Sequence, residues 1–505
     1  MFFRVAFYSL VAISLSVKPA VALDEASGDT DKKNGDIERI TVRIQITNTE
    51  DEPVVGASVT PVGMRTRVER GSHYSWVTER HGKRPVAETD DAGMVEIPCP
   101  KFVYEQLEAG EITWQIEHED YIVFREDLKI DDDPATVTLK RGRRIAIAAI
   151  DADTGEKLTE NVHAILSGGG GSKEWNLTEA GMLMSRGVDV ERPMLRVFHL
   201  SNDGPIRFSD PIDLTEYGKK LRVLLRNVKL HRGTRVEGRI DETVPRPILN
   251  GTVSINVTNG LHHESWQARN TWSDWTTISE DGTFAFDSLP PGCVAQMIAV
   301  CDGWVCSPPA QEDIDAVGLK FNVGQMISSR VLPQVAALDG DVISPVIKME
   351  PTASCQVTVL APDGTPLEGA MVATNPNQMW LGRGSQIVGD GYSVSAGLKL
   401  TEAQRKEMWN WEKRKQLAAL GVRSPGSDRY MKTSGPDGVV VIDTLPGGAE
   451  GKPKSASIGV MHELYEQPVS DDQRMRRNTS VMMIQGETAK ITIKMDKKGT
   501  NVIGK

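Results

Sequence analysis

The chain has 505 residues, with 58 Lys or Arg against 69 Asp or Glu, and a formal net charge of -11 at pH 7. Acidic and basic residues are interspersed along most of it, so no basic surface is indicated and nucleic acid is an unfavourable partner. The length is too great for one hydrophobic core, and about three to five domains are expected.

The first 22 residues have the pattern of a secretory signal peptide. Arg4 precedes an apolar run over 5–17, and a small-residue triplet, 20–22, provides a cleavage site. The run is shorter than the roughly 20 residues that a spanning helix needs, so cleavage is favoured over a retained membrane anchor. Residues 23–38 are acidic and polar and are predicted to be a flexible linker. We therefore expect a mature protein without an integral membrane span that is secreted, periplasmic or held in the cell envelope.

Strand signals then recur four times along the chain. In the first copy Ile40, Val42, Ile44 and Ile46 alternate with polar residues, which is typical of a half-buried strand. The second copy departs most from the shared pattern. The predicted domains, in chain order, are 39–141, 142–232 (divergent), 233–350 and 351–497.

Each copy also contains a polar turn that ends in glycine and leads into another alternating strand. Glycine is expected there because the turn requires a positive φ angle. The four turn glycines are Gly93, Gly181, Gly282 and Gly438. Each copy closes with a further alternating strand, at 136–139, 221–230, 342–349 and 490–495. Short strands without an alternating strand–helix rhythm predict an all-β protein of tandem antiparallel sandwiches, two sheets in each copy.

One segment of the fourth copy has strong helix signals. Thr401 and Gln404 match a capping box, residues 401–420 are rich in helix formers, and Gly421 follows them. We expect a helical insertion at about 400–421, placed in a loop that connects two strands. Its apolar residues are predicted to dock it on its own domain, with a partner-binding face as the alternative.

The turn motifs resemble those of carboxypeptidase regulatory-like domains. Pro-x-x-Gly-Ala-x-Val occurs at 53–59 and at 366–372, and Leu-Pro-Pro-Gly occurs at 289–292. The resemblance implies Ig-like, transthyretin-like sandwiches, a type grouped with carbohydrate-binding-like folds. It also implies a secreted accessory module that has no catalytic residues of its own, and contact with carbohydrate would be an analogy with other members of the fold.

No familiar catalytic or cofactor-binding motif is present in the sequence. No histidine has a glutamate three residues after it, as a zinc carboxypeptidase would need, and no second histidine completes a zincin motif with His462 and Glu463. Neither a Gly-x-Ser-x-Gly elbow nor a phosphate-binding glycine loop is found. The glycine run at 168–171 is predicted to be a flexible loop. His262, His263 and Glu264 could ligate a metal, but adjacent residues on a strand point to opposite faces, so a polar loop is favoured. We expect no enzyme activity, no cofactor and no metal site.

A dense group of tryptophans in the third copy is the candidate ligand site. Trp266, Trp272 and Trp275 lie within ten residues, and exposed indole rings can stack on sugars or other flat apolar groups. The alternative is that the rings fold back over the sandwich as a small satellite core, and this alternative is favoured.

Five cysteines are few for a secreted chain of this size, and an odd number leaves at least one unpaired. Asp302 and Gly303 form a turn between Cys301 and Cys306, so a disulfide between these two cysteines is one hypothesis. A bridge from Cys293 to either of them, or buried free thiols, are the alternatives.

Together these observations favour a non-enzymatic, multi-domain binding or adhesion protein that contacts carbohydrate or another envelope protein through its loops. A purely structural spacer is the first alternative. An enzyme with an unrecognised site is the second, and it would require ionisable groups that converge in a pocket.

Overall fold

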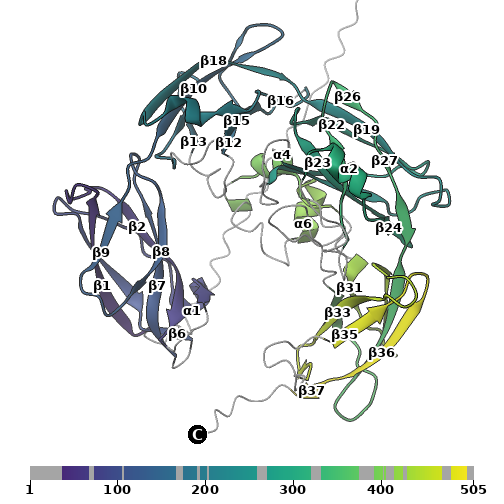
Figure 1. Cartoon of the computed structure of the whole chain (residues 1–505). Coiled ribbons are helices and arrows are strands. Elements are labelled where there is room, and N and C mark those ends of the chain that lie inside the picture. Colours follow the sequence, from purple (N-terminus) through teal and green to yellow (C-terminus); the bar gives the residue numbers. More distant parts are fainter. Residues whose placement is uncertain are drawn as a thin grey trace, which may run out of the picture. The chain divides into compact units, whose positions relative to one another are not determined.

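The structure is a computed structural model that describes residues 37–497, apart from 68–72, 105–106, 167–174, 190–193, 202–203, 259–269, 320–330, 375–391, 402, 405–413, 425–428 and 469–478. Almost all of the described secondary structure is β-strand, arranged in successive groups of sheets (Figure 1). The predicted all-β fold class is therefore confirmed. The chain divides into two compact units, residues 1–116 with 124–138, and residues 117–123 with 139–505.

Sandwich 1 is formed by two sheets whose apolar faces meet. Ile44 and Ile97 from one sheet and Trp114 from the other are fully buried. The first sheet contains β5 (Met94–Pro100), β1 (Arg39–Asn48) and β9 (Ala135–Leu139). The second contains β3 (His73–Ser75), β2 (Ser58–Thr66), β7 (Leu107–Glu117) and β6 (Phe102–Tyr104), with β4 (Ala87–Glu88) on β2 and β8 (Phe124–Lys129) on β7. A short helix, α1 (Thr78–His81), lies between β3 and β4.

Sandwich 2 is the copy whose sequence departs most from the pattern that the four copies share. Its long closing strand β18 (Arg222–Arg232) pairs with β10 (Arg144–Asp151) and with β16 (Arg207–Phe208), and so joins all its strands into one sheet. The remaining elements are β11 (Lys157–Leu158), β12 (Val162–Leu166), β13 (Trp175–Leu177), β14 (Leu183–Ser185), β15 (Met194–His199), β17 (Ile212–Asp213) and the 3-10 helix η1 (Leu214–Tyr217).

Sandwich 3 follows sandwich 2 without a spacer. One sheet contains β22 (Thr283–Leu289), β19 (Thr234–Ile240), β26 (Val342–Ile343) and β27 (Val346–Ile347). The other contains β21 (Asn270–Thr277), β20 (Thr252–Thr258), β23 (Val294–Cys301), β24 (Trp304–Cys306) and β28 (Met349–Pro351), with β25 (Gln334–Ala337) on β23. The helix α2 (Gln311–Ala316) packs near β25.

Sandwich 4 repeats this arrangement and begins two residues after β28. One sheet contains β32 (Val439–Leu445), β29 (Ala353–Leu360) and β36 (Thr488–Lys494). The other contains β31 (Met431–Thr433), β30 (Met371–Thr374), β33 (Lys454–Met461), β34 (Tyr465–Glu466) and β37 (Asp496–Lys497), with β35 (Thr479–Met483) on β33. The sheets of sandwiches 1–4 comprise residues 39–139, 144–232, 234–351 and 353–497, and the domain boundaries given above stay predictions at residue level.

All four predicted turn glycines have positive φ angles, between 68° and 91°. At all four the space is also too small for a side chain, and at two of them the nearest atom is a backbone carbonyl oxygen. A Cβ on Gly93 would lie 2.4 Å from the Ile46 carbonyl oxygen, and one on Gly438 would lie 2.5 Å from the Val359 carbonyl oxygen. Each of these turns therefore holds the first strand of its sandwich close to the strand that pairs with it. Glycine is required there because of the positive φ angle and because of the close contact.

One pairing differs from the antiparallel arrangement that the strand pattern predicts. In sandwiches 2, 3 and 4 the first strand runs parallel to the closing strand: β10 to β18, β19 to β26 and β27, and β29 to β36. Antiparallel pairing is found in the hairpins of all four sandwiches, for example between β1 and β5, β10 and β14, β19 and β22, and β29 and β32. A sandwich closed in this way has its two ends on opposite sides, which suits a tandem array with short junctions.

The helical insertion occurs between two paired strands, as predicted. It interrupts the hairpin of β30 and β31, and the Thr401 backbone and side chain exchange hydrogen bonds with Gln404, which confirms the capping box. The helix α6 (Arg414–Ala419) is followed by Gly421 at φ 71°. An additional helix, α4 (Val394–Leu398), precedes the capping box. Two short helices outside the insertion, α1 and α2, are also described, and the sequence pattern does not predict them.

Candidate functional site

Trp272, one of the three candidate ligand-binding tryptophans, is buried in a contact between sandwiches 2 and 3. Its side chain is 1% exposed. The ring packs edge-on against Phe198 of β15 and Phe208 of β16, with a distance of 5.2 Å between ring centroids in each pair. The aromatic residues that cover the ring lie more than 60 residues earlier in the chain. Trp272 therefore presents no face to a ligand.

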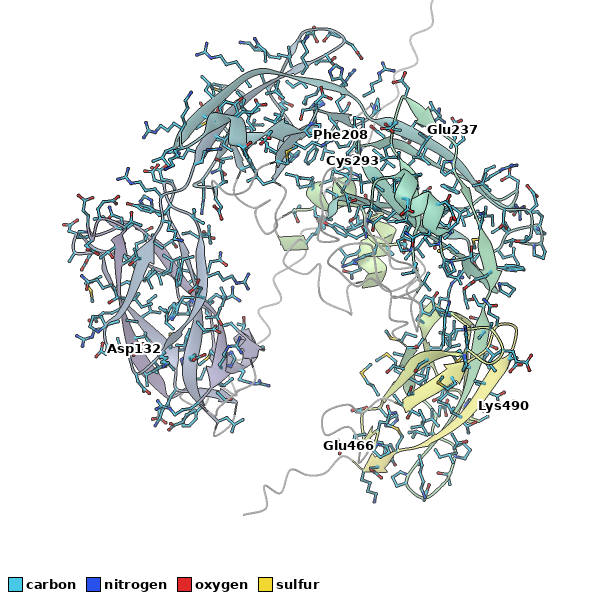
Figure 2. All side chains as sticks on the ribbon, viewed as in Figure 1. Asp132, Phe208, Glu237, Cys293, Glu466 and Lys490 are labelled. Atoms are coloured by element: carbon cyan, nitrogen blue, oxygen red, sulfur yellow. The ribbon has the colours of Figure 1, made fainter. Side chains whose placement is uncertain are left out.

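Polar contacts surround this aromatic cluster and complete the first junction, between sandwiches 2 and 3. Arg196 is 3% exposed and donates from Nη1 to the Pro291 carbonyl oxygen at 3.0 Å. Burial lowers the pKa of its guanidinium from the ordinary value. The backbone N–H of Gly233 donates to the Ile206 carbonyl at 3.2 Å. Phe208 and Cys293, from the two sandwiches, belong to one buried apolar cluster (both labelled in Figure 2).

Sandwiches 3 and 4 meet at a second junction that is continuous with their sheets. β28 pairs with β24, and the Thr352 N–H, directly before β29, donates to the Gly303 carbonyl at 2.9 Å. Lys454 Nζ lies 3.2 Å from Glu350 Oε1, and both side chains are largely buried. Such a pair is costly to break, because either partner alone would be an uncompensated buried charge.

Trp275, the second candidate tryptophan, contacts the insertion of sandwich 4. The half-buried indole donates from Nε1 to the Gly421 carbonyl at 3.0 Å. Its neighbour Asp274 accepts hydrogen bonds from the Trp275 backbone N–H and the Ser393 side chain, and α4 packs against β21. Burial, together with the negative charge of Asp287, raises the pKa of Asp274 to about 6. The insertion therefore docks on the preceding sandwich, and docking on its own domain stays a prediction.

The structure separates Cys301 from Cys306. The predicted Asp302–Gly303 turn is present, but Cys301 lies opposite Trp304 in the hairpin and Cys306 is two residues further along. All five cysteines are buried free thiols, which is the alternative to the pairing of Cys301 with Cys306. Burial raises the pKa of Cys301 to about 11 and that of Cys306 to about 12. These thiols therefore act as small apolar side chains at ordinary pH.

Several predicted features lie outside the described residues. These are the third tryptophan, Trp266, the polar group His262, His263 and Glu264, the glycine run at 168–171 and the predicted signal peptide. Within the described ranges, no group of three or more His, Cys, Asp or Glu side chains is arranged to hold a metal ion. The same ranges contain no helix that is both long and apolar enough to cross a membrane.

The junction residues other than tryptophan are not singled out by motif analysis, although the sequence carries a signal for them. Every residue of β23, with the sequence VAQMIAVC, is buried, and so is every residue of β20. In β15 the four central residues are buried. The runs of uncharged residues in β20 and β23 indicate strands that are covered on both faces, whereas β15 contains Arg196 and lacks this signal. Such runs could have located the faces where neighbouring sandwiches meet.

Comparisons with known proteins do not assign the chain to a family. No protein-family model matches it, and neither does any curated protein. Solved structures with some likeness include the minor pilin GBS52 of Streptococcus agalactiae, which is 12% identical, with 54% of this chain and 100% of that chain covered and a TM-score of 0.23.

A streptococcal ancillary pilin is 10% identical over 91% of this chain and 100% of its own, with a TM-score of 0.19. The major pilin BcpA of Bacillus cereus has the same identity and coverage, with a TM-score of 0.16. At such identities and TM-scores the likeness carries no argument about function. What the structure itself establishes is a multi-domain β-sandwich protein, and the resemblance to carboxypeptidase regulatory-like domains stays a hypothesis.

Proposed function

We propose that this protein is a non-enzymatic support of the cell exterior or envelope, in which sandwiches 2, 3 and 4 act as one stiff element that holds loops for contact with other proteins. The observation that carries the proposal is the burial of Trp272 between Phe198 and Phe208. An aromatic residue that could have bound a ligand instead fastens one sandwich to the next.

The second junction supports the same proposal. A spacer needs neighbouring domains that do not rotate freely, and domains rotate freely unless their interface is large and apolar. Here a backbone hydrogen bond from Thr352 to Gly303, a buried ion pair and a docked insertion link the two sandwiches. The spacer alternative of the sequence analysis is therefore favoured over a set of independent binding modules.

Carbohydrate contact through the tryptophan-rich loop is the weaker form of the proposal. Trp272 is inside a junction and Trp275 is half-buried against Gly421, which leaves Trp266 as the remaining candidate. A glycan array tests it directly, with Trp266→Ala as the variant that should lose any binding. Absence of binding by the wild-type protein removes carbohydrate from the proposal and leaves the spacer.

The stiffness can be measured by electron–electron spin distances in the full chain. Because all five native thiols are buried, introduced cysteines can be labelled selectively, at Leu177→Cys in sandwich 2 and Val441→Cys in sandwich 4. We expect one narrow distance distribution, broadened by Trp272→Ala. A broad distribution in the otherwise wild-type chain would overturn the spacer proposal.

The predicted export of the protein is part of this proposal and has its own test. Cleavage after Ala22 should give a mature chain that begins at Leu23. N-terminal sequencing of the protein recovered from outside the cytoplasm of its natural host checks this start. A chain that retains residues 1–22 and stays in the cytoplasm would contradict the predicted location.

A further inference from the structure

The outward face of one sheet is covered in sandwiches 2 and 3 but is open in sandwich 4. A sandwich strand normally alternates between a buried and a wet face. In sandwiches 2 and 3 the strands β15, β20 and β23 are buried on both faces. Part of the cover comes from the sandwich that follows in the chain. Trp272 and Pro291 of sandwich 3 cover Phe198 and Arg196 of sandwich 2, and Gly421 of sandwich 4 lies against Trp275 of sandwich 3.

In sandwich 4 the corresponding strands keep an open face. The burial of β33 alternates along its length, and Met461 at its end is 53% exposed. The outward residues of β30, β31 and β33 are nevertheless uncharged, as they would be on a face that is covered by another surface. They are Met371, Ala373, Met431, Thr433, Ser455, Ser457, Gly459 and Met461, which we call the methionine face.

The opposite sheet of the same sandwich provides a comparison. Its outward residues include Lys490, labelled in Figure 2, together with Lys494 and Asp443, which is the usual composition of a solvated surface. The uncharged composition is therefore a property of one face and not of sandwich 4 as a whole. Contiguous exposed patches without charge mark interaction sites more often than ordinary surface.

The register brings the methionines together. Met371 lies directly opposite Met461, and Met431 is diagonal to Met371, since it pairs with Ala373 on the same strand as Met371. Methionine side chains are flexible and polarisable and are enriched at the centres of protein interfaces. At the margin, Glu466 pairs with Met461 and Asp496 pairs with Glu466, so the face has an acidic edge.

We propose that the methionine face binds a second copy of this chain, through residues 77–86 of sandwich 1 in that copy, which lie between β3 and β4. In sandwich 4 the segment between the second strand and its edge partner supplies Gly421 and Ser393, which dock on the preceding sandwich. In sandwich 3 the contact with the preceding sandwich is made by Trp272, the third residue of the edge partner β21. In sandwich 1 this position holds β3, α1 and β4.

The loop of sandwich 1 has the chemistry that the methionine face requires. Val77 and Val86 are 39% and 64% exposed, which provides apolar contacts for the thioethers. Lys83 and Arg84 between them are exposed and match the acidic edge formed by Glu466 and Asp496. The contact joins two different surfaces, so it is a heterologous interface that can extend from copy to copy.

Sedimentation velocity of the full mature chain over a range of concentrations tests the proposal. We expect the average mass to rise with concentration in the wild type. Met461→Lys should weaken association at least about tenfold, because it would place a positive charge beside Glu466, the carboxylate that the proposal pairs with Lys83 and Arg84. The matched control Val441→Lys, on the opposite sheet of sandwich 4, should associate like the wild type. A wild type that stays monomeric throughout would overturn the proposal.

A second variant guards against a folding defect in sandwich 4. Val86→Asp changes only the loop of sandwich 1 and should abolish association to the same extent. In addition, a mixture of Met461→Cys and Val86→Cys chains should form a mixed disulfide, since the native thiols are buried. If Met461→Cys alone forms the dimer as well as the mixture does, the face binds itself and the assigned partner loop is wrong.

Discussion

Replacing Trp272 with alanine should destabilise two sandwiches at once. A buried tryptophan removes about 150–250 Å² from water, and at about 25 cal/mol per Å² this corresponds to roughly 4–6 kcal/mol. Measured Trp→Ala costs in cores are about 3–5 kcal/mol, since the site partly collapses. We therefore expect about 4 kcal/mol, shared between sandwich 3, which contains the ring, and sandwich 2, whose Phe198 and Phe208 lose their cover.

Hydrogen exchange read by mass spectrometry on the full chain separates these two shares. The slowest amides of β20 and of β15 should both exchange faster in Trp272→Ala, by up to about a thousandfold for a loss of about 4 kcal/mol. Leu249→Ala, at an exposed position of sandwich 3, should change neither strand measurably. The reasoning is refuted if only β20 loses protection, because the ring would then stabilise its own sandwich alone.

Four further predictions follow from individual contacts. Lys454→Met should cost about 2–4 kcal/mol in urea unfolding because it leaves Glu350 buried without its partner, and Glu350→Gln in the same chain should recover part of that loss. Because the pKa of Asp274 is raised, the free energy of unfolding should fall as pH rises from about 4 through about 6. Asp274→Asn should therefore be more stable than the wild type at pH 7.5, by on the order of 1–2 kcal/mol, and equally stable near pH 4. A stability difference that does not change with pH over this range would contradict the raised pKa. Gly93→Ala should destabilise sandwich 1 by clearly more than the approximately 1 kcal/mol expected for Gly56→Ala. Both glycines have positive φ angles, but only at Gly93 would the new Cβ collide with backbone atoms. Equal losses of stability in thermal unfolding would contradict the close contact at Gly93. All five thiols should resist a water-soluble thiol reagent in the native protein and react fully after denaturation, whereas three reactive thiols in the denatured chain would reveal a disulfide.

The regular features of the fold could be predicted from the sequence because their causes are local. Alternation along β1 places Ile44 and Ile46 in the core, and the turn glycines have the φ angles that their turns require. The capping box forms because Thr401 and Gln404 are three residues apart on one helical turn. Each of these depends only on residues that are close in sequence.

The candidate site could not be predicted in the same way, because its meaning depends on distant partners. Nothing near Trp272 in the sequence says that Phe198 and Phe208 will cover it, and an exposed aromatic platform and a buried wedge have the same local pattern. The hairpin around Gly303 likewise predicts proximity of Cys301 and Cys306, while the register places Trp304 opposite Cys301. The sequence signal that does indicate a strand covered on both faces is a long uncharged run such as β23.

The parallel pairing of first and closing strands was also hidden from a local analysis. Alternation shows that a strand has one buried face, but it does not show the direction of its neighbour. Only the placement of β29 and β36, about 130 residues apart, decides that they run parallel. Topology of this kind is fixed by which edges remain available after the hairpins have formed.

A double-mutant cycle between Phe198 and Trp272 tests the central claim, that neighbouring sandwiches are fastened through buried junctions. Unfolding free energies of the wild type, Phe198→Leu, Trp272→Leu and the double variant would be measured on the full chain. An edge-on aromatic pair predicts a coupling energy of about 0.5–1.5 kcal/mol between the two sandwiches. A coupling of zero, with each variant affecting only its own sandwich, would contradict the account.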